Sequence, residues 1–260
     1  MFARLLILMV IVTLALPVTA LTRPGETAQR SWSDVAVAAK AKKHKKKDKP
    51  KFTTVTRTVR QPVTQIFAST GAITIPNGSP GTTQGNANPY PAAINVNGFA
   101  NGVITDVNLT LHGLSHTAPV DLDILLVPGQ LSGQDAIVMS DVGNDHDVTG
   151  ITLTLDDQAA APLSVNDPLT TGTFKPNNFA GSADAFPGQT PSGNSQLSLF
   201  NGGNPNGSWQ LFVVDDHVND TGQLAGGWSL QITAEADVQV QERVQNNNDN
   251  KHKKHKKGRK

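Results

Sequence analysis

The chain from Asn206 to Ile232 reads NGSWQLFVVDDHVNDTGQLAGGWSLQI, and this stretch decides the predicted fold. Its first alternating set consists of Trp209, Leu211 and Val213, and a second set alternates in the same way from Trp228 to Ile232. A period of two places each set on one face of a strand. Because a polar run joins the two segments, the sequence predicts a hairpin whose two tryptophans close a β-sheet core.

Short alternating segments of the same kind recur through the rest of the chain. In the best of them, Val103 to Leu111, the odd-numbered residues are predicted to face one side. Five Asn-Gly pairs supply tight turns between such segments. The sequence therefore predicts an all-β fold, an antiparallel β-sandwich or barrel. Further strands or returns to the core are expected at residues 73–75, 94–96, 121–127, 136–139, 148–155 and 197–200.

Charge is segregated along the chain, although the net charge of all 260 residues is only +1. Residues 61–236 hold one base, Lys175, against fifteen acidic residues, which gives a net charge of −14. The lysine-rich stretches 40–51 and 251–260 carry most of the compensating bases. Like charges at this density repel one another, so both stretches are expected to be disordered. They are interpreted as arms that bind an anionic cell-envelope polymer or lipid surface; solubilising tails, or contacts with the acidic body of the same chain, stay open.

The N-terminus has the pattern of an export signal. Arg4 precedes an apolar run from Leu5 to Leu16, and cleavage is predicted after Ala20. A membrane anchor is disfavoured because Pro17 ends the run well before the roughly 20 apolar residues of a span. The protein is therefore expected to be secreted or associated with the cell envelope. The predicted domains are a signal peptide at 1–20, a Lys-rich disordered linker at 21–60, a β-sandwich at 61–236, and a Gln/Asn-rich and then Lys-rich disordered tail at 237–260, with residues 54–59 either a strand or an extended linker.

Several motifs follow one another along the body: Asp121-Leu-Asp-Ile-Leu-Leu with Pro128-Gly129, Gly207-Ser-Trp-Gln-Leu, Val214-Asp-Asp, Asp220-Thr-Gly and Gly227-Trp-Ser-Leu. Through these motifs the chain from about Phe67 to Thr233 resembles the P domain, or homo B domain, of the subtilisin-like proprotein convertases, in a bacterial stand-alone form. The resemblance implies a jelly-roll-like β-sandwich of the galactose-binding type. It also implies an association with serine-type endopeptidases and proteolysis, since the family's domain follows a subtilisin-type catalytic domain. This chain has no catalytic domain and no nucleophile segment, so it is predicted not to be an enzyme.

No nucleophilic triad is expected. Ser115 and His116 are adjacent, and neighbours on an extended chain point apart. His116 is instead expected in a turn, with its ring partly exposed. The acidic pairs Asp156-Asp157 and Asp215-Asp216 follow predicted strands and are interpreted as residues that cap turns.

Calcium is the candidate cofactor. Acidic side chains concentrate in two short stretches, and calcium takes six to eight oxygen ligands that loops often supply. A solvated acidic loop is the alternative reading of both stretches. The candidate metal-binding residues are Asp141, Asp145 and Asp147 in the first stretch, and Asp215, Asp216 and Asp220 in the second.

The sequence favours an exported, non-catalytic interaction or structural module of P-domain type, held at an anionic surface by its basic arms. One alternative is an accessory or stabilising domain for a separately encoded subtilisin-like serine endopeptidase or another exported protein. A second is a carbohydrate-binding module, for which Tyr90 is the candidate stacking residue because Trp209 and Trp228 are expected in the core. Nucleic acid is not an expected partner because the body is acidic.

Overall fold

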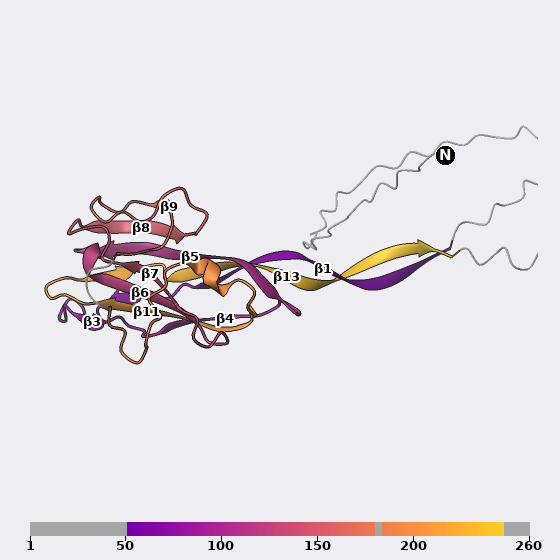
Figure 1. Cartoon of the computed structure of the whole chain (residues 1–260), viewed down its shortest axis with the longest axis horizontal. Coiled ribbons are helices and arrows are strands. Elements are labelled where there is room, and N and C mark those ends of the chain that lie inside the picture. Colours follow the sequence, from indigo (N-terminus) through magenta and orange to yellow (C-terminus); the bar gives the residue numbers. More distant parts are fainter. Residues whose placement is uncertain (1–50, 180–183, 247–260) are drawn as a thin grey trace, which may run out of the picture. The chain divides into compact units, whose positions relative to one another are not determined.

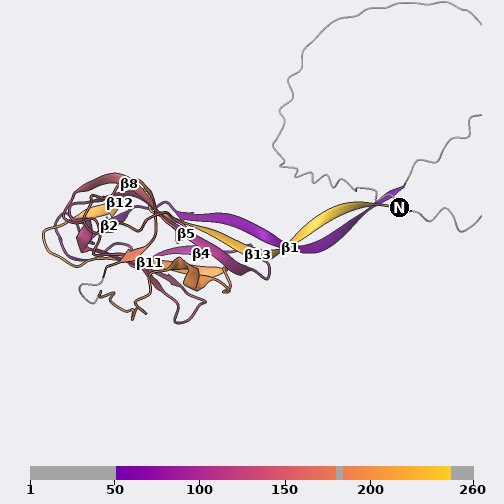
Figure 2. The same ribbon diagram turned by 45° about the horizontal axis from the view of Figure 1, so that its top comes forward.

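The structure, a computed structural model, describes residues 51–179 and 184–246 (Figures 1 and 2). These residues are nearly all β, and two sheets pack face to face as a sandwich, as the sequence predicts. The described residues do not include the predicted signal peptide, most of the first lysine-rich stretch or any of the second. The elements are β1 (Phe52–Ser69), β2 (Ile73–Ile75), β3 (Gly85–Asn86), β4 (Ala92–Val96), β5 (Val103–His116), η1 (Pro119–Asp121), β6 (Leu122–Pro128), β7 (Ala136–Ser140), β8 (Val148–Leu155), β9 (Gly172–Phe174), β10 (Asn177–Asn178), η2 (Leu197–Phe200), β11 (Gly207–Asp215), β12 (Gly222–Leu224) and β13 (Trp228–Gln245).

The first sheet is built on β5. Strands β12 and β13 pair with one edge of β5, and β8 pairs with the other. Leu224 of β12 lies opposite Leu114 and Trp228 of β13 lies opposite Leu111, so β12 and β13 are successive halves of one interrupted strand. Strands β2 and β1 continue the sheet outside these halves, and β9 continues it beside β8.

The second sheet runs in the order β10-β7-β6-β11, with β3 and β4 on the far side of β11. Most pairs in both sheets are antiparallel, but β8 with β9 and β7 with β10 are parallel. The connections from Leu155 to Gly172 and from Ser140 to Asn177 are long enough to return the chain in the same direction. Strict antiparallel pairing, which the sequence predicts, therefore does not hold at these two edges.

The hairpin predicted between residues 209 and 232 is wrong. Strand β11 lies in the second sheet and β13 in the first, so the two strands face each other and do not pair. Both edges of β11 are already occupied, by β6 and by β3 with β4, and residues 216–221 cross to the other sheet. The prediction that both tryptophans are core residues is confirmed. Trp209 of β11 and Trp228 of β13 are fully buried, and they enter the core from opposite sheets.

Strand β5 departs from the predicted alternation at two places. Ile104 is buried and Val103 is partly exposed, because an irregularity opposite Thr233 and Ala234 shifts the register by one residue. Further irregularities against β8 let the strand continue as far as His116, where the sequence predicted a turn. His116 is consequently buried, and the expectation of a partly exposed ring is wrong.

Strands β1 and β13 continue past the sandwich as a two-stranded ribbon (Figure 1). Strand β13 pairs with β5 only as far as Glu235, whereas its pairing with β1 continues to Gln245 opposite Phe52. Residues 52–60 and 237–245 thus form strands, which corrects the boundaries predicted for the disordered linker and tail. Each segment alone has too little apolar surface to fold, but cross-strand pairs such as Arg57–Glu242, 3.3 Å apart, form only when both are present.

Candidate metal centre

Acidic residues from several segments meet at one end of the sandwich. Strand β11 ends there with Asp215 opposite Leu122, at the start of β6. Strand β12 begins there with Gly222 opposite His116. Because the interrupted strand β12–β13 runs from this end to the tip of the ribbon, the acidic end and the ribbon tip are at its opposite ends.

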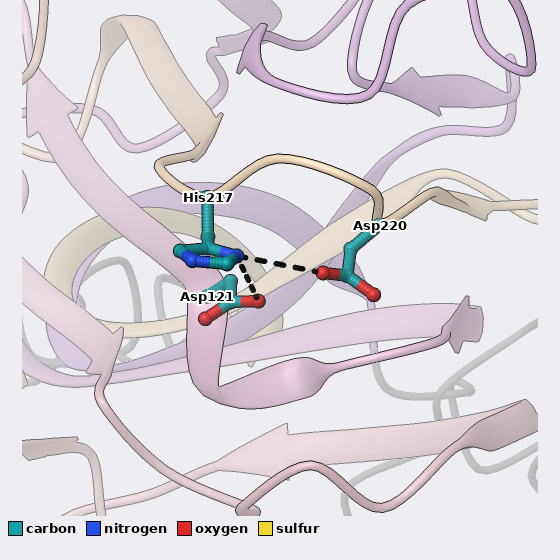
Figure 3. A group of neighbouring side chains, drawn as sticks. All are labelled: Asp121, His217 and Asp220. Atoms are coloured by element: carbon teal, nitrogen blue, oxygen red, sulfur yellow. Dashed lines mark ion pairs between the residues drawn. The ribbon is translucent and has the colours of Figure 1, made fainter.

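One group consists of Asp121, His217 and Asp220 (Figure 3). His217 Nδ1 lies 3.9 Å from Asp121 Oδ2 and 3.8 Å from Asp220 Oδ2. The imidazole is largely exposed, whereas both carboxylates are mostly buried, and Thr117 donates a hydrogen bond of 2.8 Å to Asp220 Oδ1. Burial and the neighbouring charge of Asp220 raise the pKa of Asp121 to about 6.

A second group surrounds the buried hydroxyl of Ser140, at the end of β7. Ser140 Oγ lies 2.9 Å from Asp184 Oδ1 and 3.4 Å from Asp141 Oδ2, and it is near enough to Asp123 to lower the pKa of that carboxyl. A hydroxyl has a single proton to donate, so it can satisfy only one of these three carboxylates at a time. The remaining charge at this point needs a cation or a proton.

The closeness of these acids raises the pKa values of several of them. Burial, followed by the charges of neighbouring aspartates, raises the pKa of Asp123 to about 8 even though Ser140 opposes the shift. Burial likewise raises the pKa values of Asp184 and Asp216, and the charge of Asp141 adds to both shifts. Lys175 is the one lysine or arginine between residues 61 and 236, and it lines a shallow groove beside Asp157 and η2.

Asp215 has a different environment from its neighbours. Its Oδ2 lies 3.3 Å from His116 Nε2, and both side chains are completely buried. Its Oδ1 accepts the backbone N–H of His217 at 3.2 Å, and His116 Nδ1 lies 2.9 Å from the carbonyl oxygen of Ala118. This carboxylate therefore lies between β5, β11 and the loop that carries His217. Its Oδ1 accepts a hydrogen bond, whereas Oδ2 and His116 Nε2 face each other without forming one.

The six predicted metal-binding residues are dispersed by the fold. Asp141 and Asp216 belong to the crowd around Ser140, Asp220 lies with His217, and Asp215 is engaged by His116. Asp145 and Asp147 are exposed in the loop between β7 and β8.

Three further acids complete the two groups and were missed from the sequence. Asp121 and Asp123 could have been found, because both lie at the start of the strand predicted for residues 121–127. In the structure Asp121 ends η1 and joins the first group, whereas Asp123 lies on β6 and joins the second. Asp184 carried no such signal, since it lies in a long loop.

The acidic pair Asp156-Asp157 follows β8 and caps turns, as predicted. In the pair Asp215-Asp216, Asp215 accepts the N–H of His217 but is buried against His116, and Asp216 lies near Asp141. Asp156 Oδ1 accepts the N–H of Gln158 at 2.7 Å, and Asp157 accepts the N–H groups of Leu197 and Ser198 at the start of η2, at 3.1 and 2.7 Å. These contacts are those of capping carboxylates.

Asp157→Ala is expected to lower the free energy of unfolding by about 1 kcal/mol, because two backbone donors lose their acceptor. Denaturant titration measures the loss. Asp145→Ala is the matched control, since its carboxylate is exposed, and it should leave stability unchanged. Equal stabilities for the two variants would contradict the capping role.

Comparison with known proteins gives no relative for this chain: no family model, no curated protein and no solved structure matches it. The P-domain interpretation therefore rests on the motifs quoted from the sequence. In the part of the chain that the structure describes, no helix is long and apolar enough to cross a membrane.

Proposed function

We propose that the protein is an exported, non-catalytic module of P-domain type that binds an anionic cell-envelope surface through its two lysine-rich stretches. The observation that carries the proposal is the pairing at the tip of the ribbon. Asn246 donates its backbone N–H to the carbonyl oxygen of Lys51 at 2.8 Å, next to the pair Phe52 and Gln245. The stretches 40–51 and 251–260, some 200 residues apart in sequence, are therefore attached close to one point.

Attachment at one point makes the two stretches act on the same surface. They contain eight lysines in residues 40–51 and seven bases in residues 251–260. Each base near an anionic surface contributes about 1 kcal/mol. Once one stretch is bound, the other binds from a high effective concentration. Repulsion between the surface and the acidic end favours an orientation in which that end faces away.

Calcium bound at the acidic end is the second part of the proposal. Asp123, Asp141, Asp184 and Asp216 offer oxygen ligands alone, the kind that calcium prefers. Asp123 is more than nine-tenths buried, and no lysine or arginine of the sandwich shares this end with it. Calcium would remove the mutual repulsion of these acids and hold β6, β7 and the loop after β11 together.

The sequence motifs support an alternative function, in which the protein is an accessory domain of a separately encoded subtilisin-like endopeptidase. Chemical cross-linking of the native secreted fraction tests it, since a peptidase recovered in the cross-linked product would favour it. A carbohydrate-binding role has less support. Trp209 and Trp228 are buried, and the Tyr90 ring packs edge-on against Phe212 with centroids 5.1 Å apart.

Co-sedimentation with native envelopes, and with phosphatidylglycerol or phosphatidylcholine vesicles, tests the anionic-surface proposal. The bases of residues 40–51, of residues 251–260, or of both stretches are changed to serine. Each single set should weaken binding to the anionic material at least about tenfold, and the double set should abolish it. Rising salt should release the unaltered chain.

Lys175→Ser removes a base outside both stretches and serves as the matched control. It should bind as the unaltered chain does. If the chain with both stretches neutralised pellets normally, the sandwich itself holds the surface and the proposal fails.

A further inference from the structure

The acids of the sandwich gather at the end where β11 finishes and β12 begins. Strand β8 also starts at this end, because Val148 lies opposite His116, so the loop before β8 brings further acids to it. Lys175, the one lysine or arginine of residues 61–236, lies at the other end, since it follows Phe174, which pairs with the last residue of β8. The acidic end holds ten of the fifteen acids in residues 61–236, namely Asp121, Asp123, Asp141, Asp145, Asp147, Asp167, Asp184, Asp215, Asp216 and Asp220.

Positive charge is attached at the opposite end of the same unit. Strand β13 leaves the sandwich and runs to the ribbon tip (Figure 1), where Asn246 is bonded to Lys51. Residues 251–260 follow only four residues later, with seven bases and no acid among ten residues. The chain therefore carries a strongly basic segment and a strongly acidic surface at opposite ends of the strand path that joins them.

Neither lysine-rich stretch can reach the acidic end of its own chain. Strand β5, from the base of the ribbon to the acidic end, covers fourteen residues, and the ribbon beyond Glu235 adds ten pairs. At 3.3 Å per residue these elements extend roughly 70 Å, after some shortening by strand twist. Residues 247–260 span at most about 50 Å when fully extended, and residues 40–51 span about 43 Å. The ten acids therefore receive no base from either stretch of their own chain.

We propose that residues 251–260 of one copy bind the acidic end of a second copy of this chain. The two sides match in sign and are similar in number, with seven bases against ten acids. Asp145, Asp147 and Asp216 are exposed, so flexible lysine side chains can approach them without a change in the fold. One exposed ion pair contributes little, but a network of several pairs in one contact can hold two molecules together.

The geometry also determines how copies can assemble. The two sides of this contact lie at opposite ends of one molecule, so the contact is heterologous. Two copies can bind each other reciprocally, or further copies can add in an open head-to-tail chain. Residues 251–260 are the better ligand of the two stretches, because residues 40–51 include Asp48. The contact goes beyond the anionic-surface proposal and does not depend on it, since it needs no envelope.

Sedimentation equilibrium of the chain, as processed by the cells that export it, tests the proposal in the presence of a chelator. At low ionic strength the mass should reach at least twice that of the monomer, and it should return to the monomer mass by about 0.5 M salt. Changing the bases of residues 251–260 to serine should abolish association. A monomer at every concentration in low salt, or association that persists in high salt, would overturn the proposal.

Variants at the acidic end test the other side of the contact. The double variant Asp145→Lys/Asp147→Lys reverses two exposed charges and should weaken association at least about tenfold. The double variant Gln239→Lys/Gln241→Lys is the control, because it places two lysines at exposed positions on the ribbon, away from the acidic end. It should associate at least as well as the unaltered chain. Equal weakening by both double variants would show that net charge alone matters, and the proposal would fail.

Mixing the two defective variants gives a readout that loss of folding cannot imitate. The serine variant of residues 251–260 keeps its acidic end, and Asp145→Lys/Asp147→Lys keeps its basic stretch. Each should stay monomeric alone under conditions where the mixture of the serine variant with the unaltered chain forms a complex. That complex should disappear when the serine variant also carries Asp145→Lys/Asp147→Lys. A complex that survives this change would place the contact elsewhere and overturn the proposal.

Carbodiimide cross-linking locates the contact directly, because it joins a lysine amine to a carboxyl group in immediate contact. A mixture of ordinary and ¹⁵N-labelled copies distinguishes links between molecules from links within one. The expected product joins residues 251–260 of one isotope to an acid of the acidic end of the other. Links from residues 251–260 that occur only within one copy, or only to acids outside the acidic end, would contradict the proposed contact.

Discussion

Asp123→Asn is expected to stabilise the protein by roughly 3 kcal/mol at pH 8 in the presence of a chelator. Asp123 is only 4% exposed, and burial among other acids raises its pKa to about 8, from the usual value near 4. Above that pH the folded protein holds a buried charge that the unfolded chain exposes to water. Asparagine has the same shape without the charge, so the variant avoids the cost.

The pH dependence has a definite sign. Between about pH 4 and about pH 8 the folded state binds more protons at Asp123 than the unfolded state does, so stability falls as pH rises through this range. Asp121, with a pKa of about 6, adds to the fall at the acidic end of the range. Thermal melts in chelator should show the decline for the unaltered protein and a shallower one for Asp123→Asn.

Calcium should reverse the order of thermal stability of the unaltered chain and the Asp123→Asn variant. The unaltered chain should gain melting temperature from calcium at pH 8, whereas Asp123→Asn, which lacks one carboxylate ligand, should gain much less. Asp145→Asn is the control, because this acid is exposed in the loop after β7 and should change neither the melt nor the calcium response. If the Asp123→Asn variant is less stable than the unaltered chain in chelator at pH 8, the buried charge of Asp123 does not destabilise the fold.

The fold was predictable from local patterns, but its pairing was not. Alternation located most strands, and Val148 to Leu155 was placed correctly at both ends. Local alternation cannot assign β11 and β13 to the same or to different sheets, because a strand of either sheet buries one face in the same way. The buried outward-facing Phe212 and Val214 of β11 were the one sign that this strand is covered on both sides.

The candidate site was predictable only in part, for the same reason. Asp141 and Asp216 were found because acids cluster in short stretches, but such clusters do not show which of their members converge. Asp145 and Asp147 lie within six residues of Asp141 and still point to solvent. Convergence is set by long-range register, such as Asp215 opposite Leu122, which no local pattern contains. His116 was misplaced because irregularities in β5 turned it inward.

Asp215→Leu and His116→Leu are each expected to cost about 3–5 kcal/mol of folding stability. Each change leaves the other member of a completely buried pair without its partner, with Nε2 and Oδ2 only 3.3 Å apart in the intact protein. The His116 ring packs directly against Gly222, where no side chain would fit, so the ring has little room to adjust on that side. Denaturant unfolding measures both losses, and His146→Leu, at an exposed histidine, is the control.

The double variant Asp215→Leu/His116→Leu measures how strongly the two side chains stabilise each other, apart from their packing against other residues. If the two side chains stabilise the fold mainly through each other, the double variant should be more stable than the sum of the two single losses predicts, by at least about 1 kcal/mol. Additive losses would contradict a coupled pair. Asp215 Oδ1 also holds the backbone of His217, so Asp215→Leu should release the loop that carries Asp216 and reduce the calcium response. His116→Leu leaves that backbone bond in place and should keep more of the response, which separates the loop anchor from the buried pair.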